Sequence, residues 1–470
     1  MLFNSYVFML AFLPLTLLCY FLLGRLPEKI QLNKVFLVLA SFLFYGYNNP
    51  SYVPIIAGSI LINYALSQLM LTQQKKALRL PLILLGLFLN LGVLFYFKYH
   101  DFFFENLNGA FGLHLTLNHL ALPLGISFFT FQQLSYVIDS YKRTVPRYNI
   151  LDYSLFVTFF PQLIAGPIVR YIDVEKQLTY RECTAEKTAR GMIRFSMGLA
   201  KKVIVSNTVA AICDGIFGST NTVPAFTAWV GVICYALQIY FDFSGYSDMA
   251  IGMGHMLGFD FLENFNYPYV SCSVQEFWRR WHISLSSWFR DYLYIPLGGN
   301  RRGKVRTYIN LIIVFACTGL WHGASFSFIV WGLWHGLFLV IERLGFKKAL
   351  DKLPKFIGWI YTMLVVLVGW VFFRADTLSA AMKYLGEMFS FSGGVANGMA
   401  QFDNLSFIIT VIAIVLCTPV YQFLKGKLEK TEGGKKAAFV IGAVLATGLF
   451  ILSVIFLTGS GYNPFIYFRF

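Results

Sequence analysis

Long apolar segments recur along almost the whole chain, and they constrain its fold more than any other feature. A helix needs roughly 17–25 apolar residues to cross about 30 Å of hydrocarbon, and runs of that length follow one another from residue 5 to residue 459. Because backbone amides inside a bilayer must find partners within their own segment, an open chain crosses lipid as helices. The sequence therefore predicts an all-α, polytopic membrane protein.

Composition leaves no room for a second, water-soluble domain. Of the 470 residues, 57% are hydrophobic and only 13% are charged, which lies outside the range of ordinary soluble domains. No Pro/Ser linker, coiled coil or low-complexity tract divides the chain. We therefore expect residues 1–470 to form a single integral-membrane domain.

Apolar run lengths predict about eleven transmembrane segments, together with two stretches that do not fit simple crossings. Residues 150–170 are flanked by basic connections on both sides, so this stretch is expected to enter the membrane and turn back at Pro161 or at Gly166-Pro167. The expected crossings are 5–24, 33–49, 52–71, 79–98, 120–140, 190–216, 224–243, 307–341 as a hairpin, 356–374, 405–424 and 437–459.

The second unusual stretch, "QEFWRRWHISLSSWFRDYLYI" at 275–295, has the spacing of an amphipathic helix. Such a helix favours the membrane interface or a polar cavity within the protein, and a purely structural surface helix remains an alternative. The apolar face is predicted to carry Phe277, Trp281, Leu285, Trp288 and Tyr292, and the polar face Arg280, Ser284, Ser287 and Asp291.

The net charge of +15 at first suggests a nucleic-acid partner. However, the lysines and arginines lie in short connections between apolar runs, a pattern that orients a membrane protein. Basic connections such as 170–202 and 425–436 are therefore placed on the cytoplasmic side of the cell (inner, cytoplasmic) membrane. Counting from 425–436, the last apolar run crosses once, so residues 460–470 form an aromatic tail at the outer face.

His322 is the leading candidate for chemistry. It lies near the middle of the 307–341 hairpin, roughly fifteen residues and therefore about 23 Å of helix from either basic end. An ionisable side chain at that depth is a functional candidate by default. His335 would lie about 12 Å deep, so it is expected to support the site or to pack. A hydrogen-bonded packing role remains open for both histidines.

His282 follows "WRRW" in the amphipathic stretch and is either a second active-site imidazole or an ordinary interfacial residue. Arg279 and Arg280 could hold the phosphates of a donor, because guanidinium binds phosphate bidentately, or they could face lipid headgroups. No metal site is predicted, since the histidines and cysteines lack ligand spacing.

Five long motifs are distinctive: "PLGISFFTFQQLSYVIDSY" (123–141), "FFPQLIAGPIVRY" (159–171), "YFDFSGYSDMAIGMGHMLGFDFLENFNYPY" (240–269), "FWRRWHISLSSWFRDYLYIPLGGNRRG" (277–303) and "GLWHGASFSFIVWGLWHG" (319–336). Together they resemble the membrane-bound O-acyltransferase family, in particular the branch that acetylates alginate and peptidoglycan. The resemblance implies that His322 is the family's central histidine and His282 its second. It also implies an intramembrane tunnel where a cytoplasmic acyl donor meets an acceptor from outside.

The chain ends in "NPFIYFRF", residues 463–470, with Tyr467 in the middle of an aromatic cluster. Aromatic residues favour membrane interfaces, so an anchoring role is the simplest interpretation. The tail also resembles the acyl-carrying tyrosine motif of a small partner protein in the more distantly similar teichoic-acid D-alanylation systems. That resemblance predicts that Tyr467 is an acyl relay.

The resemblance to the branch that acetylates polysaccharides predicts the partners. The acyl donor is expected to be acetyl-CoA, with no tightly bound cofactor. An extracytoplasmic serine-dependent acyltransferase is expected to receive the acyl group and pass it to an envelope polysaccharide, while membrane lipids surround the protein and nucleic acid has no role. The acyl group itself, acetyl or D-alanyl, and the polymer stay open.

A membrane transporter or flippase is the rival hypothesis. In that case Asp139, Asp242 and Asp248, which lie in or beside apolar runs, would serve as coupling sites. An acyltransferase that acts on a lipid or a protein is a further alternative.

Overall fold

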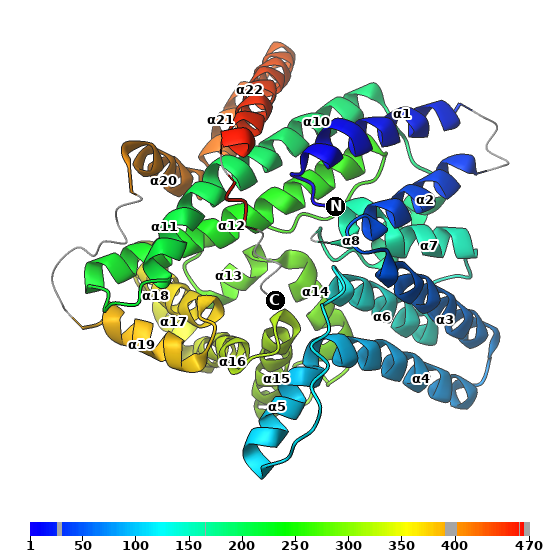
Figure 1. Ribbon diagram of the computed structural model, residues 1–470, viewed down its shortest axis with the longest axis horizontal. Coiled ribbons are helices and arrows are strands. Elements are labelled where there is room, and N and C mark those ends of the chain that lie inside the picture. The colour runs from blue at the N-terminus through cyan, green and yellow to red at the C-terminus, as the bar shows by residue number, and fades with distance from the viewer. Residues whose placement is uncertain (26–30, 165, 391–401, 460, 465–470) are drawn as a thin grey trace. The chain divides into compact units, whose positions relative to one another are not determined.

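The computed structural model describes residues 1–25, 31–164, 166–390, 402–459 and 461–464. Across these residues every regular element is a helix (Figure 1). The predicted all-α class is confirmed. The apolar runs give helices for the reason stated above, that a helix satisfies its own backbone amides.

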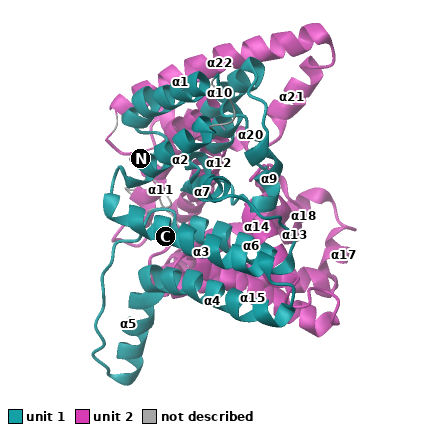
Figure 2. Cartoon of the chain, turned by 90° about the vertical axis from the view of Figure 1, so that its right-hand side faces the viewer, with its two compact units in different colours: residues 1–195, 249–262 teal, residues 196–248, 263–470 magenta. Residues whose placement is uncertain are grey.

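The chain divides into two compact units, coloured separately in Figure 2. The first unit comprises residues 1–195 and 249–262. Its helices are α1 (Leu13–Leu23), α2 (Leu32–Gly46), α3 (Val53–Thr72), α4 (Lys76–Leu94), α5 (His100–Phe111), α6 (Ile126–Lys142), α7 (Ile150–Thr158), α8 (Phe160–Leu163), α9 (Tyr171–Thr179) and most of α10 (Ala185–Ala200).

The second unit comprises residues 196–248 and 263–470, and most of α12 belongs to it. Its helices are α11 (Asn207–Phe217), α12 (Ala225–Met256), α13 (Val274–Arg280), α14 (Ile283–Phe289), α15 (Lys304–His322), α16 (Phe326–Ile341), α17 (Lys347–Leu350), α18 (Lys355–Arg374), α19 (Leu378–Met388), α20 (Asn404–Leu416), α21 (Val420–Leu428) and α22 (Glu432–Gly459).

Six helices in the described residues are long and apolar enough to cross a membrane, or seven if the bent pair α20–α21 forms one span. The chain is therefore a multi-pass membrane protein. Other predicted crossings form apolar helices that are shorter, Val7–Leu23 and Leu32–Gly46. The six long helices are Pro50–Thr72, Lys76–Phe111, Ala225–Met256, Phe326–Leu350, Lys355–Arg374 and Glu432–Gly459.

The 150–170 stretch breaks close to the proline that the sequence singled out. Helix α7 ends at Thr158, Phe159 adopts a non-helical conformation with ψ 109°, and α8 starts again with Pro161 in its first turn. Proline fits the first turn of a helix because its missing amide hydrogen would be unpaired there anyway. The break therefore lies two residues before Pro161.

The basic stretch 170–202 is largely helical rather than a short connection. It contains α9 and α10, and its last lysine, Lys202, is completely buried. The predicted crossing at 190–216 overlaps the second half of α10 and nearly all of α11, so the sequence analysis had assigned part of this basic stretch to a helix.

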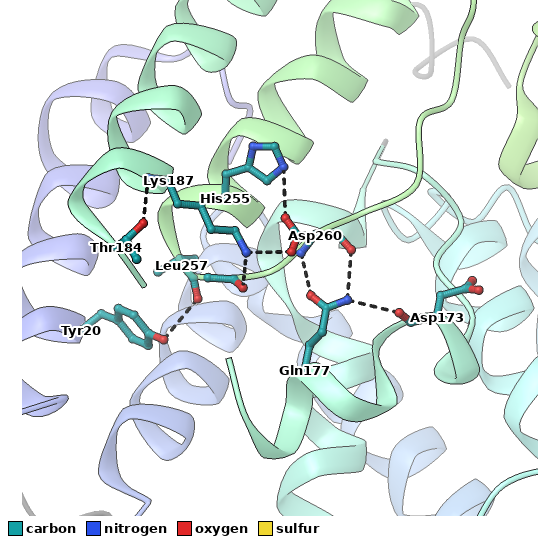
Figure 3. Close-up of polar contacts among 9 residues, drawn as sticks. Tyr20, Asp173, Gln177, Thr184, Lys187, His255, Leu257 and Asp260 are labelled. Carbon is teal, nitrogen blue, oxygen red and sulfur yellow. Dashed lines mark hydrogen bonds and ion pairs between the residues drawn. The ribbon is translucent and has the colours of Figure 1, made fainter. Parts of the chain in front are cut away.

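A polar network in the first unit fixes the turn that follows α12 (Figure 3). Lys187 on α10 donates to Asp260 Oδ2 at 2.7 Å and to the carbonyl of Gly258 at 2.9 Å. His255 Nε2 lies 3.4 Å from the other oxygen of Asp260. Gln177 on α9 pairs with the backbone of Asp260 through both of its amide atoms, at 2.6 and 3.1 Å. All these partners lie within one unit, so the network holds the turn against α9 and α10.

In the second unit, the hairpin of α15 and α16 explains the repeated "GLWHG". A Cβ at Gly319 would lie 2.2 Å from the carbonyl oxygen of Phe328, and one at Gly332 would lie 2.1 Å from that of Phe315. The first glycine of each repeat thus allows the two helix backbones to touch. Small residues at such contacts are typical of helix packing in membranes. The predicted hairpin is formed, and its turn begins at Gly323.

Candidate functional site

His322 is the last residue of α15, directly before the hairpin turn. Its side chain is surrounded by aromatic rings, with ring centroids 4.9 Å from Trp321, 5.1 Å from Trp331 and 5.0 Å from Phe373. The residue is only 6% exposed. An imidazole that ends a helix inside an aromatic cage is held in place by packing from three sides.

His282 lies at a break in the amphipathic stretch, where the sequence predicted one continuous helix. That prediction is wrong: α13 ends at Arg280, and α14 begins at Ile283. His282 between them has φ 43° and ψ 56°, the left-handed region. A non-glycine residue there is strained, and such strain clusters at functional sites. The predicted apolar face is nevertheless buried, with Phe277 and Leu285 at or below 1% exposure.

The break has a tertiary cause. The segment that follows α12 pairs with residues 280–283 through its backbone. Asn266 N donates to the carbonyl of Arg280 at 2.9 Å, and Ile283 N donates to the carbonyl of Asn264 at 3.0 Å. These bonds replace helical hydrogen bonds, so the chain turns at His282.

Asn264 also fixes the tautomer of His282. Asn264 Oδ1 lies 3.1 Å from His282 Nδ1 and 3.3 Å from the backbone N of Ser284. A backbone N–H can only donate, so the asparagine atom facing it must be the oxygen, and that oxygen must accept from His282 Nδ1–H. The asparagine amide nitrogen donates to Ser247 Oγ at 3.1 Å. The lone pair of neutral His282 is therefore on Nε2.

Burial lowers the pKa of His282 to about 3, well below its usual value. The imidazole is consequently neutral at every physiological pH. Its Nε2 atom has no hydrogen-bond partner among the residues that the structure describes. A fully buried imidazole nitrogen with a bare lone pair is a ready acceptor for a hydroxyl or water hydrogen.

The structure brings His282 and His322 together. Their ring centroids lie 6.5 Å apart, with an angle of 61° between the ring planes. At this separation no nitrogen of one ring can come within the roughly 2.7–3.2 Å of a direct hydrogen bond to the other. A single oxygen atom between the rings could contact both.

His335 does not share this site. Trp331 lies between the two hairpin histidines, with its ring 5.1 Å from His322 and 5.4 Å from His335. His335 is fully buried against Trp278, and a Cβ at Gly369 would come within 2.7 Å of its Nε2. Its surroundings are those of a packing residue that supports the aromatic cage.

Glu342 ties the hairpin to the segment that carries His282. Its carboxylate accepts from the backbone N of Val274 at 2.6 Å and of Gln275 at 3.0 Å. A carboxylate at a helix N-terminus satisfies unpaired amides and interacts favourably with the helix dipole. This cap positions α13 against α16, and so helps to set the distance between the two imidazoles.

The two arginines predicted to bind the donor differ in their surroundings. Arg280 is engaged within the protein: it donates to Glu276 Oε1 at 3.0 Å and to the carbonyl of Asn266 at 3.1 Å. Arg279 is exposed. Of the two, only Arg279 therefore offers its guanidinium to a ligand without breaking contacts.

Two of the three carboxylates of the transporter hypothesis, both in the second unit, are ion-paired. Asp242 lies 2.5 Å from Lys202 Nζ, and Asp248 lies 2.6 Å from Lys201 Nζ. Asp139, in the first unit, is buried on α6. Tyr467 lies outside the described residues.

Three functional candidates escaped the sequence analysis. Asn264 lies in the motif at 240–269, where a polar asparagine among aromatic residues is the sequence signal that could have identified it. Glu342 lies beside Arg343 at the end of the predicted hairpin, and Lys202 lies at the end of the basic stretch 170–202, so neither was considered as a functional residue. Nothing in the local sequence indicated their partners. In the described part of the chain, no three His, Cys, Asp or Glu side chains lie close enough to hold a metal ion.

The chain as a whole is similar to several known proteins. The sequence pattern of the membrane-bound O-acyltransferase family matches residues 42–378. A Pseudomonas putida protein named "Probable alginate O-acetylase AlgI" is 41% identical over 496 aligned residues, which cover 100% of both chains. A Helicobacter pylori "Peptidoglycan O-acetyltransferase" is 40% identical, covering 84% of this chain and 80% of the relative. A Bacillus subtilis "Teichoic acid D-alanyltransferase" is 29% identical over 47% of this chain and 58% of the relative.

Proposed function

The chain belongs to the membrane-bound O-acyltransferase family, and we propose that it transfers an acetyl group from a cytoplasmic thioester toward hydroxyls of an extracytoplasmic polysaccharide. The relatives named for alginate and for peptidoglycan O-acetylation support the acetyl group and a polysaccharide acceptor. The more distant D-alanyltransferase matches only about half of the chain. The proposed donor is acetyl-CoA, which is consumed rather than kept as a cofactor.

The pair of buried imidazoles, His282 and His322, is the observation that carries this proposal. Two ring centroids 6.5 Å apart can act on one reacting oxygen. A hydroxyl is a poor nucleophile at neutral pH until a base removes its proton. A well-aligned base contributes roughly 10²–10⁴-fold to the rate.

We assign the base to His322. In the first step the hydroxyl oxygen attacks the thioester carbonyl, a C–O bond forms, and the C–S bond to coenzyme A breaks. His322 takes the hydroxyl proton and returns it to the leaving thiolate. His282 is less suited to this task, because a conjugate acid with a pKa near 3 makes it a weak base at neutral pH.

His282 is assigned to orient the base. Its hydrogen is on Nδ1, bonded to Asn264, so neutral His282 cannot donate from Nε2 to a carbonyl oxygen. It can accept, through one bridging oxygen, a hydrogen bond that leads to His322. That bond would hold one nitrogen of His322 as the donor and leave the other as the base, as a third group does in catalytic triads.

Tyr467 is proposed to carry the acyl group, with the tail at the outer face of the cytoplasmic membrane. A phenol is a more acidic leaving group than an aliphatic alcohol, so an acetyl ester of Tyr467 would remain activated toward a second hydroxyl. The proposed acceptor is the serine of an extracytoplasmic acyltransferase, which esterifies the envelope polysaccharide. Arg279, with its exposed guanidinium, is the proposed contact for donor phosphates.

The test is to mix purified protein, in lipid nanodiscs, with acetyl-CoA labelled in the acetyl group. We expect release of free coenzyme A and a label on the C-terminal peptide in the mass spectrum. A transporter or flippase would produce neither. Label on lipid rather than on the chain or on added polysaccharide would favour the lipid-acceptor alternative.

A further inference from the structure

Lys202 is a buried cation with an unusual set of partners. It lies in a short π-helical stretch, Lys201–Ser206, that joins α10 to α11, and such stretches occur frequently at functional sites. Its side chain is 1% exposed, and its ammonium pairs with Asp242 at 2.5 Å. It also donates to Asn207 Oδ1 at 3.0 Å and to the carbonyl oxygen of Pro464. The buried ammonium group is therefore held by one ion pair and two hydrogen bonds.

The third acceptor belongs to a segment that we call the C-terminal strap, residues 462–464. Two further bonds hold the strap to the same unit. Asn207 Nδ2 donates to Asn463 Oδ1 at 3.1 Å. The hydroxyl of Tyr462 donates to Asp214 Oδ2, whose other oxygen lies 2.5 Å from Arg374. Each residue of the strap is thus bonded to α11 or to the π-helical stretch before it.

We propose that Lys202, Asn207 and Asp214 are positioning residues that anchor the strap and thereby set where the C-terminal tail begins. This inference rests on the proposed relay role of Tyr467. The tail then starts from a buried ammonium group within the second unit. A tail anchored only by aromatic residues at a membrane interface would need none of these bonds.

Lys202, which anchors the strap, is linked to the imidazole site through two neighbouring residues of α12. Asp242, the partner of Lys202, is followed by Phe243, whose ring packs against His282 with 4.6 Å between centroids. Tyr467 follows Pro464 by three residues, so its Cα can lie at most roughly 10 Å from that of Pro464. Anchoring the strap at Lys202 therefore limits how far Tyr467 can lie from the π-helical stretch that binds Pro464.

A buried ion pair is weak evidence for stability, because removing charges from water costs about as much as their attraction returns. The additional bond from Lys202 to a C-terminal carbonyl gives the pair a positioning role that a pair of apolar residues could not supply. Since removal of Lys202 would leave Asp242 uncompensated, the test acts on the exposed end of the strap.

The test uses a cysteine pair, Asn207→Cys with Asn463→Cys, in a Tyr462→Phe background and in the full-length membrane protein. Tyr462→Phe removes the bond to Asp214, and we expect a roughly tenfold loss of acetyl transfer to the C-terminal peptide. Oxidation should join the two cysteines and restore most of the activity, and a reductant should reverse the rescue. Tyr421→Phe, at an exposed tyrosine of α21, is the matched control and should keep wild-type activity.

A second pair, Asn207→Cys with Thr458→Cys at the end of α22, controls for random encounter. If Asn463→Cys crosslinks no faster than Thr458→Cys, the strap is not anchored and the inference fails. It also fails if the crosslinked protein stays at the low activity of the Tyr462→Phe background while the wild-type protein labels its C-terminal peptide. Crosslinking requires no acyl transfer, so a positive crosslink with a fully active Tyr467→Phe variant would count against the relay, not against the anchor.

Discussion

Asn264 and His282 form a hydrogen bond of 3.1 Å that determines which imidazole nitrogen is available to the site. The oxygen of Asn264 is identified by the backbone donor of Ser284, so the hydrogen of His282 lies on Nδ1. Two residues that are 18 positions apart thus set the chemistry of the second imidazole. Four predictions follow from this site and its supports.

Asn264→Asp tests the role of this hydrogen bond. A carboxylate beside His282 stabilises the imidazolium, so it should raise the pKa of His282 from about 3 toward neutral pH. The raised pKa means that His282 becomes protonated as pH falls, and its Nε2 then can no longer accept. We expect the variant to lose activity between about pH 7 and pH 5, a range in which His282 of the wild-type protein stays neutral.

The measurement is the pH profile of coenzyme A release in nanodiscs. Asn264→Ala should lower the rate at all pH values without adding an acidic limb, because it removes the bond and adds no charge. Identical pH profiles for the wild-type and Asn264→Asp proteins would contradict the role of His282 Nε2 as a required acceptor.

His322→Gln should reduce acetyl transfer by roughly 10²–10⁴-fold, the contribution of a general base. Glutamine fills a similar volume and stays polar, so the abundance of the protein in the membrane should not change. The rate of label transfer is measured beside the amount of protein by quantitative immunoblot. His114→Gln, in an exposed segment, is the control and should behave as wild type.

Tyr467→Phe should abolish labelling of the C-terminal peptide and transfer to an added acceptor, because phenylalanine has no hydroxyl to esterify. Membrane abundance should stay the same, since the ring is kept. Mass spectrometry of the C-terminal peptide is the direct readout. Transfer at the wild-type rate in this variant would rule out the relay.

Gly332→Ala should destabilise the hairpin that carries His322. The added Cβ would lie 2.1 Å from the carbonyl oxygen of Phe315, so the two helices must separate. Overpacking of this kind costs about 1–3 kcal/mol, and the thermal unfolding temperature in detergent should fall.

Gly448→Ala provides the matched control for this substitution. A Cβ at Gly448, in α22, has no neighbour within 4 Å. Its unfolding temperature should match that of the wild-type protein or exceed it slightly, because alanine favours a helix over glycine. An equal effect of both substitutions would show that the repeated glycine is not a packing contact.

Local sequence predicted much of the 275–295 stretch but not its break. Five aromatic and apolar residues at helical spacing identified the buried face, because spacing alone decides which side chains share a helix face. The left-handed residue at His282 depends on hydrogen bonds to Asn264 and Asn266, which lie outside the stretch. The spacing of apolar residues within one stretch cannot reveal a hydrogen bond to another segment.

The acidic residues in apolar runs show the same limit of sequence-based prediction. Asp242 in an apolar run is a functional candidate by its cost in lipid, and the sequence offered it as a transporter coupling site. The structure gives it Lys202, forty residues earlier in the chain, from a stretch that read as a basic connection. Asp242 could be a transporter coupling site or one half of a buried ion pair. Its partner Lys202, and not Asp242 alone, distinguishes these two interpretations.

Local features of the sequence were enough to predict a helical multi-pass membrane protein with a histidine in the middle of a hairpin. Apolar run length and helical spacing are local properties, and lipid leaves the backbone no other open-chain solution. The folded chain was needed to show that His282 lies beside His322, that Asn264 fixes the tautomer of His282, and that Lys202 bonds to the C-terminal strap. These are contacts between segments far apart in the chain, and they form only when the helices have packed.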